Sequence, residues 1–182
     1  MNSNKNSLPK GGVGVGALVS IIMGSTSDLP VMEKAMKFLD EMEIPFEVNA
    51  LSAHRTPEAV ESFAKGAAAR GIKVIIAGAG MAAALPGVIA ASTTLPVIGV
   101  PIKGSVLDGV DALYSILQMP PGIPVATVAI NGAMNAAILA CQMISLADEA
   151  LAEKMAAYKA GLGKKIEKAN QDLAQLDYKF KV

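Results

Sequence analysis

The sequence alternates short, continuously apolar runs with segments in which apolar residues recur at helical spacing. Continuous runs of β-branched and other apolar residues are typical of strands covered on both faces. Such runs predict strands at residues 18–23, 46–51, 74–79, 97–101 and 125–130. Helical spacing, Pro near a helix start and Gly after a helix end predict helices at about 28–39, 57–70, 82–92, 108–117 and 133–146.

Strands that alternate with helices in this way pair in parallel through right-handed crossovers. The predicted fold class is therefore α/β, a three-layer α/β/α sandwich with a central parallel sheet of about five strands and a flavodoxin-like architecture. We expect this domain to occupy residues 18–147. Within it, Thr56 is the predicted N-cap of the second helix and Gly71 its predicted end.

The two ends of the chain differ from the alternating region. Residues 1–17 are polar and then glycine-rich, without the apolar stretch of a signal peptide, so they are predicted to be a disordered leader. Their glycines precede the first strand, which is the wrong place for a dinucleotide-binding loop. Residues 148–182 are predicted to be a C-terminal helical extension that Gly161 and Gly163 break into two helices. Its apolar residues need a partner surface on the core or on a neighbouring subunit.

The charge balance and the rare residue types exclude several classes of protein. Lys plus Arg and Asp plus Glu both number 16, so the formal net charge is zero with the histidine neutral. This balance argues against nucleic-acid binding through bulk positive charge and against a polybasic membrane-surface protein. The single cysteine, Cys141, excludes an internal disulfide and is predicted to be a small core residue. The single histidine, His54, excludes a multi-histidine metal centre within one chain.

The chain is unusually apolar, with 18% charged residues against roughly 25% in an average soluble domain. The charge-free stretches 74–102 and 112–147 are each long enough to span a bilayer. Both contain several Gly and Pro residues, which divide them into strand-sized and helix-sized pieces. We therefore expect a soluble cytoplasmic protein without membrane contact, and its apolar composition favours a large homo-oligomer.

Predicted strand ends that are rich in small and polar residues are candidate ligand sites, because ligands bind parallel α/β sheets at the carboxyl ends of the strands. The first strand is followed by GSTSD at residues 24–28. Its glycine allows a sharp turn, and its hydroxyls and helix amides suit a phosphate. The alternative is that Ser27 or Asp28 merely caps the helix.

The next two strands end in motifs of complementary chemistry. In SAHRTP at 52–57, Arg55 can bind phosphate through two parallel hydrogen bonds, and an imidazole such as His54 can transfer a proton near neutral pH. The alternative is that His54 simply points at water. In GAGMAAA at 78–84, the small side chains allow either a ligand or a packed helix to approach the backbone. Because the three ends would face one crevice, we expect them to form one site.

These motifs, in this order, resemble the PurE family of purine biosynthesis. The resemblance covers about residues 19–144 and rests on SIIMGSTSD, SAHRTPE, IIAGAGMAAALPG, PVIGVPI and LDGVDALYSILQMPPGIPVATVAINGAMNAAILA. It implies the bacterial, class I activity, in which a carboxylate moves from the exocyclic nitrogen of N5-carboxyaminoimidazole ribonucleotide to carbon 4 of the imidazole. It also implies a homo-octamer without cofactor or metal, whose partner is this small ribonucleotide.

The same resemblance implies roles for residues of this chain. His54 would be the catalytic acid and base, Arg55 would bind the phosphate, and Asp28 would accept hydrogen bonds from the ribose hydroxyls. The substrate-binding set that it implies is Ser25, Ser27, Asp28, Ser52, Arg55, Ala79 and Gly80.

One turn departs from the family pattern. Many bacterial members read GAGGAAHLPG at the third strand end, whereas this chain has Met81 and Ala84 in place of the glycine and the histidine. Because SAHRTP is intact, we expect the missing histidine to be accessory.

Three functions are alternatives to the mutase. They are a carboxylase that combines aminoimidazole ribonucleotide directly with carbon dioxide, a non-catalytic nucleotide- or flavin-binding module, and a purely structural oligomer.

Overall fold

The computed structural model describes residues 16–182, so the predicted leader lies almost entirely outside the described residues. In the described chain, one parallel sheet has the strand order β2-β1-β3-β4-β5. This is the strand order of doubly wound, flavodoxin-like proteins, and it confirms the predicted fold class. The strands are β1 (Val19–Met23), β2 (Phe46–Ala50), β3 (Val74–Gly80), β4 (Val97–Ile102) and β5 (Ala126–Thr127).

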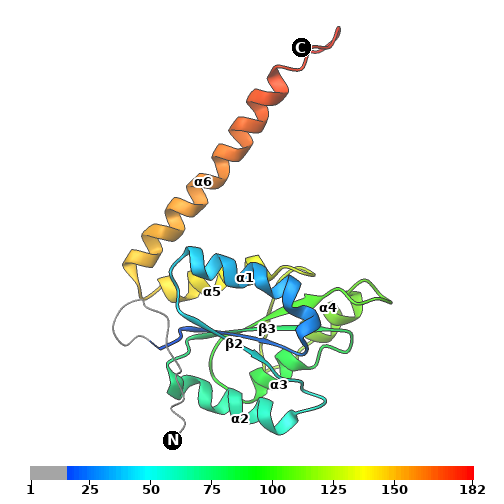
Figure 1. Cartoon of the computed structure of the whole chain (residues 1–182), viewed down its shortest axis with the longest axis vertical. Coiled ribbons are helices and arrows are strands. Elements are labelled where there is room, and N and C mark those ends of the chain that lie inside the picture. Colours follow the sequence, from blue (N-terminus) through cyan, green and yellow to red (C-terminus); the bar gives the residue numbers. More distant parts are fainter. Residues whose placement is uncertain (1–15) are drawn as a thin grey trace, which may run out of the picture.

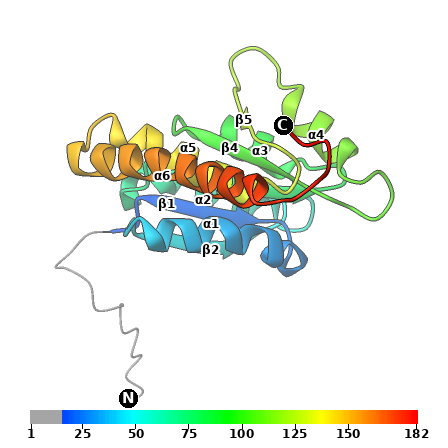
Figure 2. The same cartoon turned by 90° about the horizontal axis from the view of Figure 1, so that it is seen from above.

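Helices cover both faces of this sheet, as Figures 1 and 2 show. One face packs against α1, α5 and the start of α6, and the other packs against α2, α3 and α4. The result is the predicted three-layer sandwich. The helices are α1 (Leu29–Glu41), α2 (Pro57–Ala67), α3 (Leu85–Ala91), α4 (Val110–Leu117), α5 (Ala133–Ser145) and α6 (Glu149–Ala174), with 3-10 turns η1 (Thr26–Asp28) and η2 (Ala68–Arg70).

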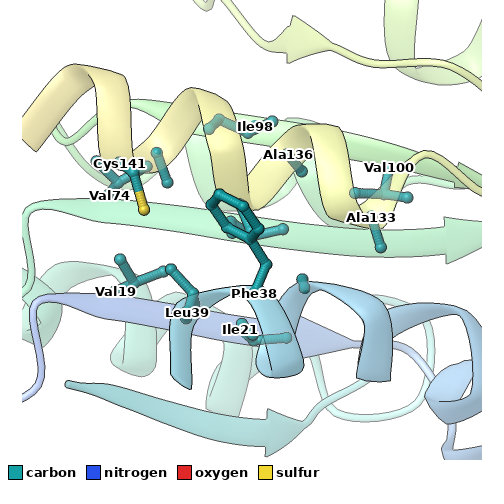
Figure 3. Close-up of a cluster of buried hydrophobic side chains, with 14 of the residues drawn as sticks. Val19, Ile21, Phe38, Leu39, Val74, Ile98, Val100, Ala133, Ala136 and Cys141 are labelled. Carbon is teal, nitrogen blue, oxygen red and sulfur yellow. The ribbon is translucent and has the colours of Figure 1, made fainter. Parts of the chain in front are cut away.

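The continuously apolar strands are buried as their composition predicts, and β1 and β4 contain no exposed residue. Between the sheet and α1 and α5, Phe38 lies at the centre of a cluster that includes Ile21 and Ala136 (Figure 3). The edge of the Phe38 ring meets the Tyr158 ring of α6, with centroids 5.0 Å apart. Burying a side chain such as Phe38 contributes about 1.5–3 kcal/mol. Cys141 belongs to this cluster, as predicted.

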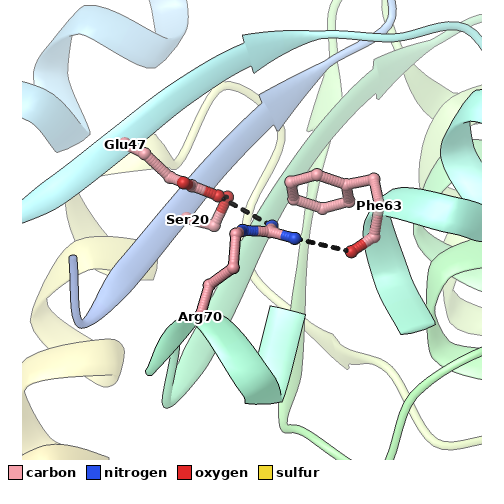
Figure 4. Close-up of polar contacts among 4 residues, drawn as sticks. All are labelled: Ser20, Glu47, Phe63 and Arg70. Carbon is pink, nitrogen blue, oxygen red and sulfur yellow. Dashed lines mark hydrogen bonds and ion pairs between the residues drawn. The ribbon is translucent and has the colours of Figure 1, made fainter. Parts of the chain in front are cut away.

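A polar network closes the β2 edge of the sheet (Figure 4). The buried Ser20 hydroxyl donates to Glu47 Oε1 at 2.9 Å, and the same oxygen accepts from Arg70 Nη2 at 3.0 Å. The Arg70 guanidinium lies over the Phe63 ring, 4.9 Å from its centroid. These contacts attach η2, at the end of the connection between β2 and β3, to strands β1 and β2. The Glu47 carboxylate thereby accepts one hydrogen bond from Ser20 and one from Arg70.

The predicted break in the C-terminal extension is wrong, because α6 is one helix that runs through Gly161 and Gly163. Glycine within a helix costs about 1 kcal/mol relative to alanine, which lowers helix stability without forbidding the helical backbone. The first turns of α6 are anchored to the core through buried Leu151 and Met155 and through the Tyr158 ring. Beyond them the helix projects away from the sandwich (Figure 1). Within residues 16–182, every helix is too short or too polar to cross a membrane.

Other predicted boundaries shift for local reasons. The third helix begins at Leu85 instead of residue 82, because Met81 and Ala83 have positive φ angles of 54° and 24° that no helix accommodates. The fifth strand is only two residues long. Gly71 ends its helix as predicted, with φ +94°. Thr56 stands at the N-cap of α2, but its side chain makes no capping bond to the helix and binds Ser52 instead.

Candidate active site

A cavity of about 350 Å³ opens at the carboxyl edge of the sheet, where the loops after β1, β2, β3 and β4 meet. The structure brings every residue of the predicted site into its lining, although they come from three different strand ends. These residues are Ser25, Ser27, Asp28, Ser52, His54, Arg55, Ala79 and Gly80. The expectation that consecutive strand ends face one crevice is therefore confirmed in geometry.

The loop after β1 is shaped by Ser25, whose extended backbone precedes the 3-10 turn η1. The Ser25 hydroxyl accepts a hydrogen bond from the Ser27 amide at 3.3 Å. Asp28 stands at the N-cap of α1 without a side-chain bond to that helix. The capping interpretation of Ser27 and Asp28 therefore fails for α1, and the Asp28 carboxyl is left at the cavity wall.

The Asp28 carboxyl is half-buried, and its environment changes its acidity. Burial raises the pKa of Asp28 above its ordinary value of 3.8, because the charged form loses hydration. Hydrogen bonds from the Ser25 backbone and the Ser27 side chain act in the opposite direction and only partly offset the burial. A carboxylate held in this way gains from any ligand that donates hydrogen bonds to it.

The loop after β2 is held in a tight turn by its own polar groups. The Ser52 amide donates to Thr56 Oγ1 at 3.0 Å, and the Thr56 hydroxyl donates back to the Ser52 carbonyl at 3.1 Å. The Arg55 amide donates to Ser52 Oγ at 3.2 Å. This turn presents His54 and Arg55, which are both exposed, to the cavity.

Arg55 connects the first two loops. Its Nη2 donates to the Gly24 carbonyl at 2.8 Å, across 31 residues of sequence. The guanidinium is therefore held beside the turn that carries Ser25 and Ser27, and its remaining N–H groups stay available to a ligand. A guanidinium, hydroxyls and amides gathered at one turn form an anion-binding arrangement.

The loop after β3 forms a wall of small and apolar side chains. Ala79 and Gly80 end the strand, and the chain then turns through Met81 and Ala83 at positive φ. A Cβ at Gly80 would lie 3.3 Å from the Ile102 carbonyl oxygen, so glycine allows the ends of β3 and β4 to lie close together.

Sequence reasoning missed the fourth strand end, where Ile102, Lys103 and Gly104 also line the cavity. The Lys103 amide donates to Asn131 Oδ1 at 2.9 Å, and its ammonium pairs with Asp108 at 2.8 Å. The rule that found the first three ends applies equally to β4. The end of β4 continues through Lys103, Gly104 and Ser105, which are small and polar residues like those of the other ends, so the same rule could have indicated it.

The ionisable groups of the lining are Asp28, His54, Arg55 and Lys103. This set can hold an anion, accept hydrogen bonds and move a proton. Within residues 16–182, no three His, Cys, Asp or Glu side chains are grouped so that they could hold a metal ion. Cys141 lies in the core, where burial raises its thiol pKa to about 11, so it supplies no nucleophile to the cavity.

Comparisons with known proteins agree on one family. The family model described as AIR carboxylase matches residues 18–165. The N5-carboxyaminoimidazole ribonucleotide mutase of Pyrococcus horikoshii is 53% identical over 161 residues, which cover 88% of this chain and 91% of that protein. The phosphoribosylaminoimidazole carboxylase of Candida glabrata is 56% identical over 160 residues, but the chain spans only 28% of its length. A crystal structure of Treponema denticola PurE is 34% identical, with a TM-score of 0.78 over 86% of this chain and 98% of that chain.

Proposed function

The chain belongs to the AIR carboxylase family, and from that premise we propose that it is an isomerase of purine biosynthesis. It converts N5-carboxyaminoimidazole ribonucleotide to 4-carboxy-5-aminoimidazole ribonucleotide. Relatives of matching length that are 53% identical carry the name of this mutase. The observation that carries the proposal is that His54, Arg55 and the turn after β1 line the same cavity. An anion anchor and a proton-transferring group thus share one site.

The polar loops supply substrate binding in this proposal. Arg55, with the hydroxyls and amides of the turn after β1, holds the 5′-phosphate. The half-buried Asp28 carboxylate accepts hydrogen bonds from the ribose hydroxyls, which replace part of the hydration that burial removes. Ser52 borders the base, and Ala79 and Gly80 leave room for the imidazole ring to approach the backbone.

The reaction itself needs one proton carrier. Protonated His54 donates to the exocyclic nitrogen as the carbamate N–C bond breaks, its electron pair returns to that nitrogen, and carbon dioxide is released within the cavity. Carbon 4 of the electron-rich ring then attacks the carbon dioxide and forms the new C–C bond. Neutral His54 takes the proton from carbon 4, which restores the aromatic ring and the starting state of the imidazole. Holding both fragments together supplies much of the rate, because it makes recombination effectively intramolecular.

A second candidate function is supported by the names of some relatives. Fungal proteins that are 56–60% identical to this chain are named phosphoribosylaminoimidazole carboxylase. A carboxylase of the same fold would combine aminoimidazole ribonucleotide directly with carbon dioxide. The chain spans only 24–28% of the length of these fungal proteins, whereas it covers 91% and 94% of two of the mutases, so we favour the mutase.

The two functions are separated by supplying each substrate alone. A mutase forms 4-carboxy-5-aminoimidazole ribonucleotide from the N5-carboxylated substrate at a rate that added bicarbonate does not change. A carboxylase forms it from aminoimidazole ribonucleotide at a rate that rises with bicarbonate. Product formation should be followed by its ultraviolet absorbance. Turnover only from aminoimidazole ribonucleotide and bicarbonate would overturn the mutase assignment.

We also propose a homo-octamer that acts in the cytoplasm. The low charge content supports an assembly, and so do the large apolar side chains exposed on and before α4, which a second copy would cover. These are Val106, Leu107, Val110, Tyr114 and Leu117. Light scattering coupled to gel filtration tests the proposal, since a mass other than eight times the 18.6 kDa of one chain would contradict it.

A further inference from the structure

The cavity has two chemically different walls. The loops after β1 and β2 supply hydroxyl, carboxyl, imidazole and guanidinium groups, which form its polar wall. The loops after β3 and β4 supply a mostly apolar wall, formed by Ala79, Met81, Ala83, Ala84, Leu85 and Ile102. If the proposed function holds, carbon dioxide is free in this cavity between the two halves of the reaction. Carbon dioxide is uncharged and has no net dipole, so the apolar wall is the part of the cavity that suits it.

Met81 occupies a particular place on this wall. It lines the cavity, yet it is 64% exposed, so it lies at the rim. Across from it, a Cβ at Gly104 would lie 3.6 Å from Met81 Cγ, so its side chain extends from the loop after β3 toward the loop after β4. Met is unbranched, with a flexible thioether that adapts to irregular surfaces.

The backbone at this position is also unusual. Met81 has φ +54°, a left-handed conformation that side chains other than Gly, Asn and Asp adopt rarely. Glycine would adopt it without steric cost. A strained residue of this kind at a ligand cavity is the type of outlier from which a functional hypothesis can be drawn. What methionine adds over glycine at this position is its side chain.

We propose that the Met81 side chain covers the apolar end of the cavity and retains carbon dioxide during the transfer. This inference rests on the proposed function and assigns Met81 a containing role, separate from proton transfer by His54. Met81 folds over the apolar wall once the ribonucleotide is bound, because contact with ligand and wall replaces contact with water. The cover slows both the escape of carbon dioxide and the entry of water.

The test measures exchange of carbon dioxide rather than rate. The full chain converts unlabelled N5-carboxylated substrate in ¹³C-bicarbonate with carbonic anhydrase, and mass spectrometry gives the labelled fraction of the product. Each labelled molecule records at least one loss of the original carbon dioxide, and the substrate incubated without enzyme gives the share that is lost in solution. We expect a low labelled fraction for the wild type and a several-fold higher one for both Met81→Gly and Met81→Ala. Met81→Leu, which keeps an apolar side chain of similar size, should stay near the wild type.

The set of variants separates the side chain from the backbone. Met81→Gly relieves the positive φ and Met81→Ala keeps it, so agreement between them assigns the leak to the missing thioether. Leu146→Ala, which shortens an exposed apolar side chain after the end of α5, is the control and should leave the labelled fraction unchanged. If both Met81 variants incorporate label no faster than the wild type, the inference is overturned and the mutase proposal stands. If the wild type forms no product from the N5-carboxylated substrate, the proposed function itself fails.

Discussion

The polar and apolar walls of the cavity are built by different physical means. The polar wall is held by hydrogen bonds. Some lie within one loop, such as the two bonds between Ser52 and Thr56, and the bond from Arg55 to the Gly24 carbonyl joins the loops after β2 and β1. The apolar wall is shaped by the positive φ angles of Met81 and Ala83 and by the close approach of the ends of β3 and β4 at Gly80. In the function that we propose, the polar wall binds the substrate and transfers the proton, and the apolar wall encloses the carbon dioxide.

The largest expected effect is on the polar wall. His54→Asn should lower kcat by about 10²–10⁴-fold, the usual contribution of a positioned acid–base group, because no second histidine exists in the chain. His54 is exposed, so the variant should keep its unfolding temperature and its affinity for aminoimidazole ribonucleotide. Steady-state kinetics, thermal unfolding and calorimetric binding measure these three quantities.

The same variant tests the classes that lack catalysis. A nucleotide-binding module of flavodoxin type would bind its ligand equally well with His54 or Asn and would show no turnover in either form. A structural oligomer would respond to neither. Wild-type turnover that survives His54→Asn would show that the proton is carried by some group other than this imidazole.

A smaller effect is expected at Asp28, where binding and stability should change in opposite directions. Asp28→Asn removes a charged acceptor for the ribose hydroxyls, which should weaken substrate binding by about 1.5–3 kcal/mol, or roughly 10–150-fold. Because the pKa of Asp28 is raised in the folded state, the fold binds the proton more tightly than the unfolded chain does. The ionised carboxylate therefore destabilises the fold at neutral pH.

The pH dependence of unfolding tests whether the pKa of Asp28 is raised or lowered in the folded state. Asn cannot ionise, so the variant should be more stable than the wild type at neutral pH. This advantage should shrink as the pH falls through the raised pKa of Asp28, where the wild-type carboxyl becomes protonated. Urea unfolding of both proteins across this range measures the difference, with Asp40→Asn, at an exposed position of the same helix, as the matched control. An advantage that grows on acidification would mean that the carboxylate is stabilised in the fold.

The two walls also differ in how far the sequence predicts them. The fold class, the sheet and the polar wall follow from apolar runs and from polar residues at strand ends, because both signals are local. The contribution of Ile102 and Lys103 was missed, although Lys103, Gly104 and Ser105 give the end of β4 the same local signal. The positive φ of Met81 leaves no signal in the residue type, because it is imposed by the surrounding loop.

Helix boundaries show the same limit. The glycines of α6 suggest a break in the helix. However, no other part of the described chain packs closely at these positions, since a Cβ at Gly161 or Gly163 would meet no atom within 4 Å. Among the described residues, no contact is therefore present that would stabilise a broken helix over a continuous one. The helix instead follows from Asp148, whose carboxylate accepts from the Leu151 amide at 3.0 Å, and from the burial of its first turns. For α6, the N-cap bond and the burial of the first turns therefore outweigh the low helix propensity of the two glycines.

The smallest expected effect concerns Ala84 of the apolar wall, the position at which the family resemblance of the sequence leads us to expect a histidine. Ala84→His restores that histidine at the half-buried N-cap of α3, where it would face the cavity. Because His54 carries the proton in both directions in the mechanism that we propose, a second imidazole should change kcat/KM by less than about tenfold, or ~1.4 kcal/mol. Kinetics of Ala84→His in the wild-type and His54→Asn backgrounds measure this. If Ala84→His restores activity to the His54→Asn variant, a histidine at either position can transfer the proton. The alanine at position 84 would then have removed a catalytic group from the apolar wall.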